Sequence, residues 1–149
     1  MRPEARRPQP RGGAPRSAGA ANEGNTVSDR DPSVPEVERF EPGPRYSEAV
    51  AAGGLVFLAG QVPEDPEAGI TQQAAEVLAA VERALALAGS TRARLVSATI
   101  YLREMADYAA FNAVWDAWLM PHPAPARACV QALLADPRWR VEVQVVAAR

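Results

Sequence analysis

The chain has 149 residues, a length suited to one ordinary domain, and 48% of its residues are hydrophobic, which is enough for a packed core. Its formal net charge of −2 argues against a dedicated nucleic-acid-binding protein. A single cysteine excludes an internal disulfide, and one cysteine with one histidine excludes the usual zinc sites built from several thiolates and imidazoles. Because no apolar run approaches the length of a membrane span, we expect a cytoplasmic protein that does not contact membranes.

The first 36 residues differ in composition from the rest of the chain. They contain many prolines, glycines, serines and alanines, and no aromatic residue. Such a segment buries too little apolar surface to offset the entropy lost on ordering, so we predict a disordered tail over residues 1–36 and a folded domain over residues 37–149. The arginines of the tail would suit a transit peptide, but its prolines oppose the amphipathic helix that a transit peptide requires. A solvated tail, or a start codon assigned too far upstream, fits this composition better.

Two strands joined by a tight turn open the predicted domain. Residues 47–51 form a short strand, and residues 52–54 contain two glycines suited to a turn. Residues 55–61 make the most apolar strand, which we expect near the centre of the sheet. Residues 63–69 are rich in Pro, Asp and Glu and predict a second turn.

Helical periodicity follows this turn. Leu78, Val81 and Leu85 recur at spacings of three and four, which predicts a helix over residues 71–88 that ends at Gly89.

A strand over residues 95–102 then leads to a second helix. Asp107 is suited to cap its N-terminus, and the helix is predicted to continue to about Met120. The apolar stripe of this helix consists of Tyr108, Phe111, Trp115 and Trp118. Three prolines at alternate positions from Pro121 to Pro125 end the helix and impose an extended chain. Two helices that cover one face of a single sheet give an α+β domain.

The last two strands each carry one charged residue among apolar neighbours. Arg127 and Cys129 share one face of the first strand, and Glu142 lies between Val141 and Val143 on the second. If these strands are adjacent, Arg127 and Glu142 can line one small pocket. The guanidinium is a fixed fork for a carboxylate, and the glutamate can hold or activate water. From spacing alone, a solvated ion pair between strands is the more common arrangement.

The order of these segments resembles that of the Rid family of reactive-intermediate deaminases (the RidA/YjgF proteins). The resemblance runs from about Pro44 to the C-terminus. It is carried by residues 46–50 (YSEAV), 55–63 (LVFLAGQVP), 99–102 (TIYL) and 107–112 (DYAAFN), and by the two strands that contain Arg127 and Glu142. The resemblance implies a single sheet with two helices on one face, in a trimer-forming domain of the chorismate-mutase-like type.

The resemblance also implies a cofactor-free activity and a site. Family members hydrolyse 2-imino or 2-enamino acids to 2-oxo acids and ammonia. Arg127 would bind the substrate carboxylate and Glu142 would position water. The substrate-binding residues would be Tyr46, contributed by a neighbouring subunit, together with Gly60, Asn112 and Cys129.

Several positions depart from the family pattern. Ala59 stands where relatives often have a serine whose hydroxyl contacts the ligand, and Gln144 replaces a second acid. Arg45 stands between Pro44 and Tyr46, where the family more often passes directly from Gly-Pro to Tyr. These departures affect the expected substrate range more than the expected fold.

Three other functions stay open at this point. A carboxylate sensor without catalysis would keep the Arg127 pocket. A mutase of the same architecture would need more cationic groups than the sequence offers. Nucleic-acid binding through the arginines of the tail is a weaker alternative. Self-association is expected because apolar residues lie on several strands and the two helices can cover only one sheet face. The family resemblance implies that the assembly is a homotrimer.

Overall fold

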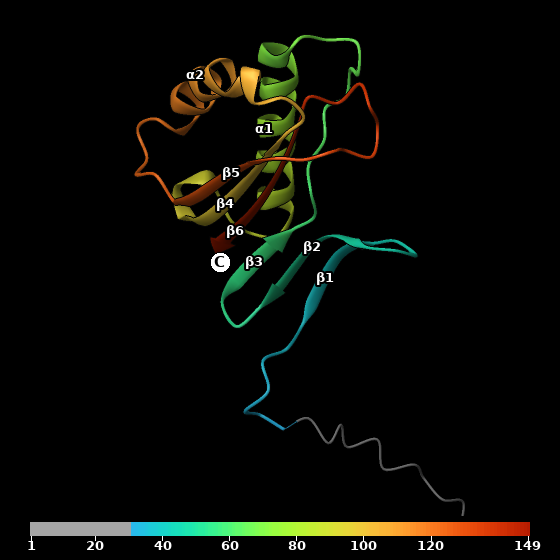
Figure 1. The fold of residues 1–149 in the computed structure, drawn as a ribbon. Helices are drawn as coiled ribbons and strands as arrows, with labels where there is room; N and C mark the ends of the chain where they lie inside the picture. The colour runs from blue at the N-terminus through green and yellow to red at the C-terminus, as the bar shows by residue number, and fades with distance from the viewer. Residues whose placement is uncertain (1–30) are drawn as a thin grey trace, which may run out of the picture. The chain divides into compact units, whose positions relative to one another are not determined.

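The computed structural model describes residues 31–149, which form one six-stranded sheet and two α-helices (Figure 1). The strands are β1 (Glu38–Pro42), β2 (Ser47–Ala52), β3 (Leu55–Leu58), β4 (Leu95–Leu102), β5 (Ala126–Gln131) and β6 (Val141–Ala148). The helices are α1 (Ile70–Leu87) and α2 (Tyr108–Leu119). Neither is long and apolar enough to cross a bilayer. Most of the tail predicted to be disordered, residues 1–30, lies outside the described residues.

The six strands lie in the order β1-β2-β3-β6-β4-β5. Among the described strands, β4 and β5 form a parallel pair, and the other neighbours are antiparallel. Both helices pack on the same face of this sheet, which confirms the predicted α+β class (Figure 1). The apolar strand β3 lies inside the sheet, as its composition predicted.

The strands that carry Arg127 and Glu142 are not adjacent. A pocket lined by both residues within one chain depended on that adjacency, but β4 lies between β5 and β6. Residues 132–140 carry the chain past β4, and a connection of this length is able to skip a strand. The two charged side chains are therefore separated by a whole strand within one chain.

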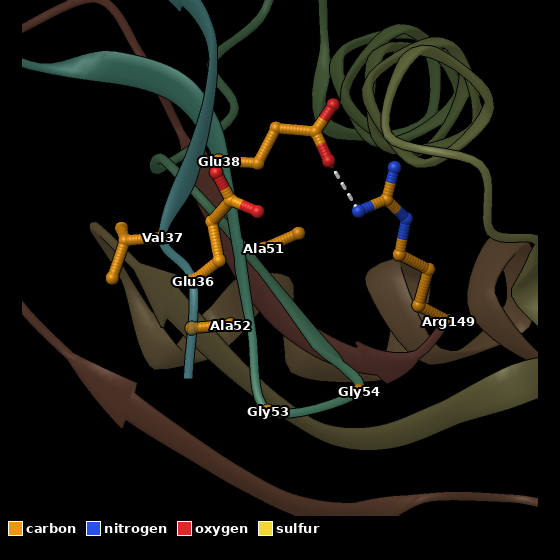
Figure 2. A pocket seen from close by; sticks show the side chains of 8 residues that line it. All are labelled: Glu36, Val37, Glu38, Ala51, Ala52, Gly53, Gly54 and Arg149. Atoms are coloured by element: carbon orange, nitrogen blue, oxygen red, sulfur yellow. Dashed lines mark hydrogen bonds and ion pairs between the residues drawn. The ribbon is translucent and has the colours of Figure 1, made fainter. Parts of the chain in front are cut away.

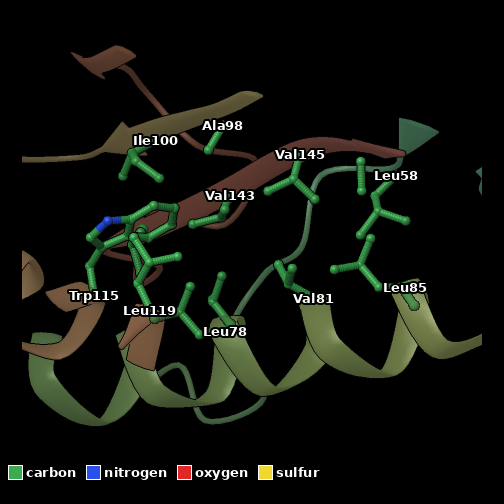
Figure 3. Packing of buried hydrophobic residues seen from close by; sticks show 14 of the residues in the cluster. Leu58, Leu78, Val81, Leu85, Ala98, Ile100, Trp115, Leu119, Val143 and Val145 are labelled. Atoms are coloured by element: carbon green, nitrogen blue, oxygen red, sulfur yellow. The ribbon is translucent and has the colours of Figure 1, made fainter. Parts of the chain in front are cut away.

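The core lies between the helices and the sheet (Figure 3). The predicted stripe of α1 is fully buried, and Gly89 follows the helix with a φ of 77°, a conformation that glycine adopts without strain. On α2 the buried residues are Phe111, Trp115 and Leu119, whereas Tyr108 is exposed. The stripe predicted for α2 was thus partly wrong, because the helix turns Leu119 rather than Tyr108 towards the sheet.

The structure contains an edge strand that the sequence did not predict. Strand β1 pairs with β2. Its residues are mostly charged and exposed, and only Phe40 is half-buried against the core. A strand so poor in apolar residues gives no clear period-two pattern. Strand β3 also ends earlier than predicted, at Leu58, and Gln61 rejoins the sheet only through an isolated bridge to Val143.

Two buried polar residues fix the loops around the end of the sheet. Asp107 is the N-cap residue of α2, as predicted, but its carboxylate does not cap the helix and instead accepts two hydrogen bonds from the Arg140 guanidinium, at 2.7 and 2.9 Å. Gln73 on α1 is fully buried, and its Oε1 accepts a hydrogen bond of 2.7 Å from the backbone N–H of Arg140. Its Nε2 lies 3.0–3.3 Å from four backbone carbonyl oxygens, those of Asp65, Pro66, Ala68 and Arg138.

Candidate functional site

Arg127 lies on the helix-covered side of the sheet. In the parallel ladder it is opposite Ala98, whose side chain is buried in the core. Residues opposite each other across a ladder point to the same side of a sheet. Contact with α2 confirms this placement, because Cζ of Arg127 lies 5.3 Å from the centroid of the Trp115 ring.

The Arg127 guanidinium has no acidic partner within the described residues. Its Nη1 atom is buried and makes no hydrogen bond. A buried donor without an acceptor is costly, by about 1–3 kcal/mol, unless another group satisfies it. Within the described residues, the ion pair that spacing alone favoured is therefore not formed. The N–H donors of the Arg127 guanidinium can accommodate an anion.

Cys129 and Asn112 lie on the same side as Arg127. Cys129 is opposite Ile100 in the ladder, and burial raises the pKa of its thiol while the nearby Arg127 charge opposes this shift. The thiol is thus kept in its neutral form. Asn112 is on α2, one helical turn before Trp115, and its Oδ1 is buried without a hydrogen-bond donor among the described residues.

Glu142 projects from the opposite face of the sheet. It alternates with the buried Val141 and Val143, and it is opposite Tyr101 on β4. Since Tyr101 is three positions from Ala98, the two side chains point to opposite faces. Glu142 is half-buried, and this burial raises the pKa of its carboxyl group above the ordinary value.

The Glu142 carboxylate rests against the backbone of Gly60. A Cβ atom on residue 60 would overlap the carboxylate, so only glycine permits this approach. The segment around Gly60 runs beside the start of β2, since the N–H of Ala59 donates a hydrogen bond of 2.9 Å to the Glu48 carbonyl. Tyr46 immediately precedes β2, and its side chain is 67% exposed.

Gln144 lies two residues after Glu142 on β6. Its amide donates to the Leu58 carbonyl at 3.4 Å, and it shares the helix-free face with Glu142. The Gln144 amide is therefore directed to the backbone of Leu58.

The predicted site residues thus form two sets. Arg127 and Cys129 lie on the helix-covered face of the sheet, with Asn112 on α2 above that face, and Glu142 and Gly60 lie together on the helix-free face. One chain does not bring Arg127 and Glu142 into one pocket, so the arrangement that adjacent strands would have allowed is not formed. The reason is the intervening β4, whose register turns the two side chains to opposite faces.

Several hollows on the described part of the domain are lined by other residues. One lies between β1, the β2–β3 turn and the C-terminal residue (Figure 2). Its wall is closed by an ion pair between Glu38 and Arg149, and the Arg149 backbone N–H donates a 2.9 Å hydrogen bond to Gly54. Within residues 31–149, no group of three or more His, Cys, Asp or Glu side chains is arranged to hold a metal ion.

A family model described as Endoribonuclease L-PSP matches residues 37–149. The chain belongs to this family, the YjgF/RidA proteins. A RutC family protein of Haemophilus ducreyi is 39% identical to it over 112 residues, which cover 75% of this chain and 96% of that protein. A 2-iminobutanoate/2-iminopropanoate deaminase of Salmonella typhimurium is 31% identical over 111 residues, which cover 70% of this chain and 87% of that protein.

Solved structures give the same result for this YjgF/RidA chain. A member of the YjgF protein family from Neisseria meningitidis superposes with a TM-score of 0.74 and 52% sequence identity. The superposition covers 76% of this chain and 95% of the Neisseria chain. The family resemblance inferred from the sequence is confirmed.

Proposed function

We propose that this YjgF/RidA protein hydrolyses reactive 2-imino acids, and their 2-enamino tautomers, to 2-oxo acids and ammonia. The observation that carries the proposal is the Arg127 guanidinium, which has a buried donor and no acidic partner within the described residues. Such a group is suited to bind a carboxylate through two parallel hydrogen bonds. The name of the Salmonella relative supports a 2-imino acid as the ligand.

In the proposed reaction the substrate carboxylate binds Arg127. Glu142 accepts a proton from a water molecule as the water oxygen bonds to the imine carbon. This proton then moves to nitrogen and gives a carbinolamine. When the hydroxyl proton is also transferred to nitrogen, the carbon–nitrogen bond breaks, and ammonia leaves as the carbonyl forms. Burial raises the pKa of Glu142, which makes this carboxylate a better proton acceptor than an exposed one.

Because Arg127 and Glu142 are on opposite faces, we propose that each site forms between two copies of the chain. One copy would supply Arg127, Cys129 and Asn112, and the next would supply Glu142, Gly60 and Tyr46. The helix-free face also needs a cover, since Phe57 and Val130 on it are 42% and 44% exposed. A homotrimer is the assembly that the family resemblance implies.

The activity is tested by coupling the purified protein to an amino-acid dehydratase that releases an imine. We expect faster formation of the 2-oxo acid than spontaneous hydrolysis gives. Arg127→Ala should lower kcat/KM by roughly a hundredfold, because it removes two charge-assisted hydrogen bonds. Absence of acceleration with aliphatic, aromatic and basic amino-acid imines would contradict the proposed function.

A second candidate is a carboxylate-binding protein without catalysis. Ala59 favours it, since this residue lacks the hydroxyl that many relatives use on the ligand. That protein would be stabilised against heat by a 2-oxo acid and would show no turnover. The same purified sample distinguishes the two candidates.

A further inference from the structure

We infer that Trp115 is a positioning residue that holds the Arg127 guanidinium for a ligand carboxylate. This inference rests on the proposed function of the same site. Nothing in the sequence pattern marked Trp115 as more than a core residue of α2. Its place beneath Arg127 gives it a second role.

The described residues offer no acidic partner to the Arg127 charge. Within the described residues the guanidinium forms no ion pair, and its buried Nη1 makes no hydrogen bond. The contact that stabilises the charge is the face of the Trp115 ring, 5.3 Å from Cζ. Tryptophan is the aromatic residue best suited to stabilise a cation in this way.

A cation–π contact leaves the N–H donors of Arg127 free for a ligand. A carboxylate partner would occupy the N–H donors of Arg127, and a ligand would have to displace it. An aromatic face attracts the charge without offering a carboxylate oxygen to those donors. Trp115 therefore orients the fork and partly offsets its desolvation while the donors stay available.

The Trp115 ring is itself held in place by its neighbours. Trp115 is 3% exposed, and its centroid lies 5.4 Å from that of Trp118. Cζ of Arg92 lies 5.9 Å from the Trp118 ring, and Arg92 pairs with Glu82 of α1 at 2.8 Å. A continuous row of side chains thus connects α1 to the guanidinium of Arg127.

The test compares Trp115→Leu and Trp115→Phe with Phe111→Leu. Phe111 lies one helical turn earlier on α2 and is fully buried, with its ring 6.1 Å from that of Trp115, so its replacement is a matched loss of core packing. We measure the Kd for 2-oxobutanoate by calorimetry, and KM and kcat for imine hydrolysis. Trp115→Leu should weaken binding and raise KM about tenfold with kcat little changed, which corresponds to the loss of a partly desolvated cation–π contact. Trp115→Phe should give a smaller effect, and Phe111→Leu should leave Kd and KM near those of the wild type.

Equal effects of Trp115→Leu and Phe111→Leu on Kd would overturn the inference. A Trp115→Leu variant that lowers kcat and leaves Kd and KM unchanged would also overturn it. If Trp115→Leu does not fold, the comparison of Trp115→Phe with Phe111→Leu decides in the same way. In an Arg127→Ala background, Trp115→Phe should have no further effect on Kd; an unchanged effect there would also overturn the inference. A wild-type protein that binds 2-oxobutanoate without accelerating imine hydrolysis contradicts the proposed function alone, because the Kd comparison still tests Trp115.

Discussion

Arg127 and Glu142 lie on opposite faces of one sheet, with the whole of β4 between their strands. No rotation of either side chain brings them together, because the pleat of the sheet fixes the side from which each projects. Any site that uses both residues therefore requires two copies of the chain.

Mixing two inactive variants tests this arrangement. We expect a trimer assembled from equal amounts of Arg127→Ala and Glu142→Gln chains to recover about a quarter of the wild-type sites, since random assembly pairs an intact Arg127 with an intact Glu142 of the next copy at that frequency. Activity is measured after the mixture is unfolded and refolded together. The control is the same mixture without joint refolding. Failure to recover activity in co-assembled trimers, seen by light scattering, would contradict the shared site.

Replacement of Gly60 by alanine should move the Glu142 carboxylate. The added Cβ would overlap that carboxylate, and a displaced proton acceptor is expected to lower kcat by about tenfold to a hundredfold. The matched control is Gly69→Ala at the start of α1, where a Cβ meets no atom within 4 Å. Near-wild-type kcat in Gly60→Ala, with the variant folded, would exclude Glu142 from the reaction as proposed.

The pH dependence of activity should follow the Glu142 carboxyl group. Burial raises its pKa above the ordinary 4.5, and the carboxylate form is the proposed proton acceptor, so kcat/KM should rise with pH through this pKa. Glu142→Gln should lower the activity and remove this step from the profile. Glu104→Gln, which changes an exposed carboxylate between β4 and α2, should leave the profile unchanged.

The same group predicts the sign of a change in stability. A pKa raised on folding means that the folded state binds more protons than the unfolded state in the interval between the two pKa values. The free energy of unfolding should therefore fall as the pH rises from 4.5 through the folded-state pKa of Glu142. Urea titrations at a series of pH values should show a smaller fall for Glu142→Gln than for the wild type.

Gln73 should matter more for stability than any surface glutamine. Gln73→Leu leaves the Arg140 N–H and several loop carbonyls without their buried partner, which should cost about 3 kcal/mol of unfolding free energy. Gln72→Leu is the neighbouring control, because Gln72 is exposed and bonds only to Glu76. Equal denaturation midpoints for the two variants would contradict the bracing role of Gln73.

The sequence predicted the buried face of an element correctly where apolar residues recur at the spacing of a helix or a strand. Leu78, Val81 and Leu85 predicted the buried face of α1, and Val141, Val143 and Val145 predicted the core face of β6. Those patterns are local, so they required no knowledge of which strands are neighbours. The alternation also placed Glu142 correctly on the face opposite these valines.

Features that depend on pairing between distant segments could not be predicted in this way. The position of β4 between β5 and β6 is set by long-range pairing, which no local period records. The role of Asp107 was missed for the same reason, because its partner Arg140 is 33 positions away. The contact of Trp115 with Arg127 likewise could not be predicted, because it joins α2 to β5 across the proline-rich connection between them.

Within residues 31–149, strand β5 has a neighbour on one side only, because it is the last strand of the sheet and pairs with β4. Half of its backbone amides therefore point away from the ladder that holds Arg127 in place. Hydrogen–deuterium exchange at these amides becomes a direct gauge of quaternary state: rapid in a dissociated chain, and slow wherever another copy covers the edge. Amide exchange on β5 therefore reports whether Arg127, which lies on the same strand, is in an assembled protein or in a dissociated chain.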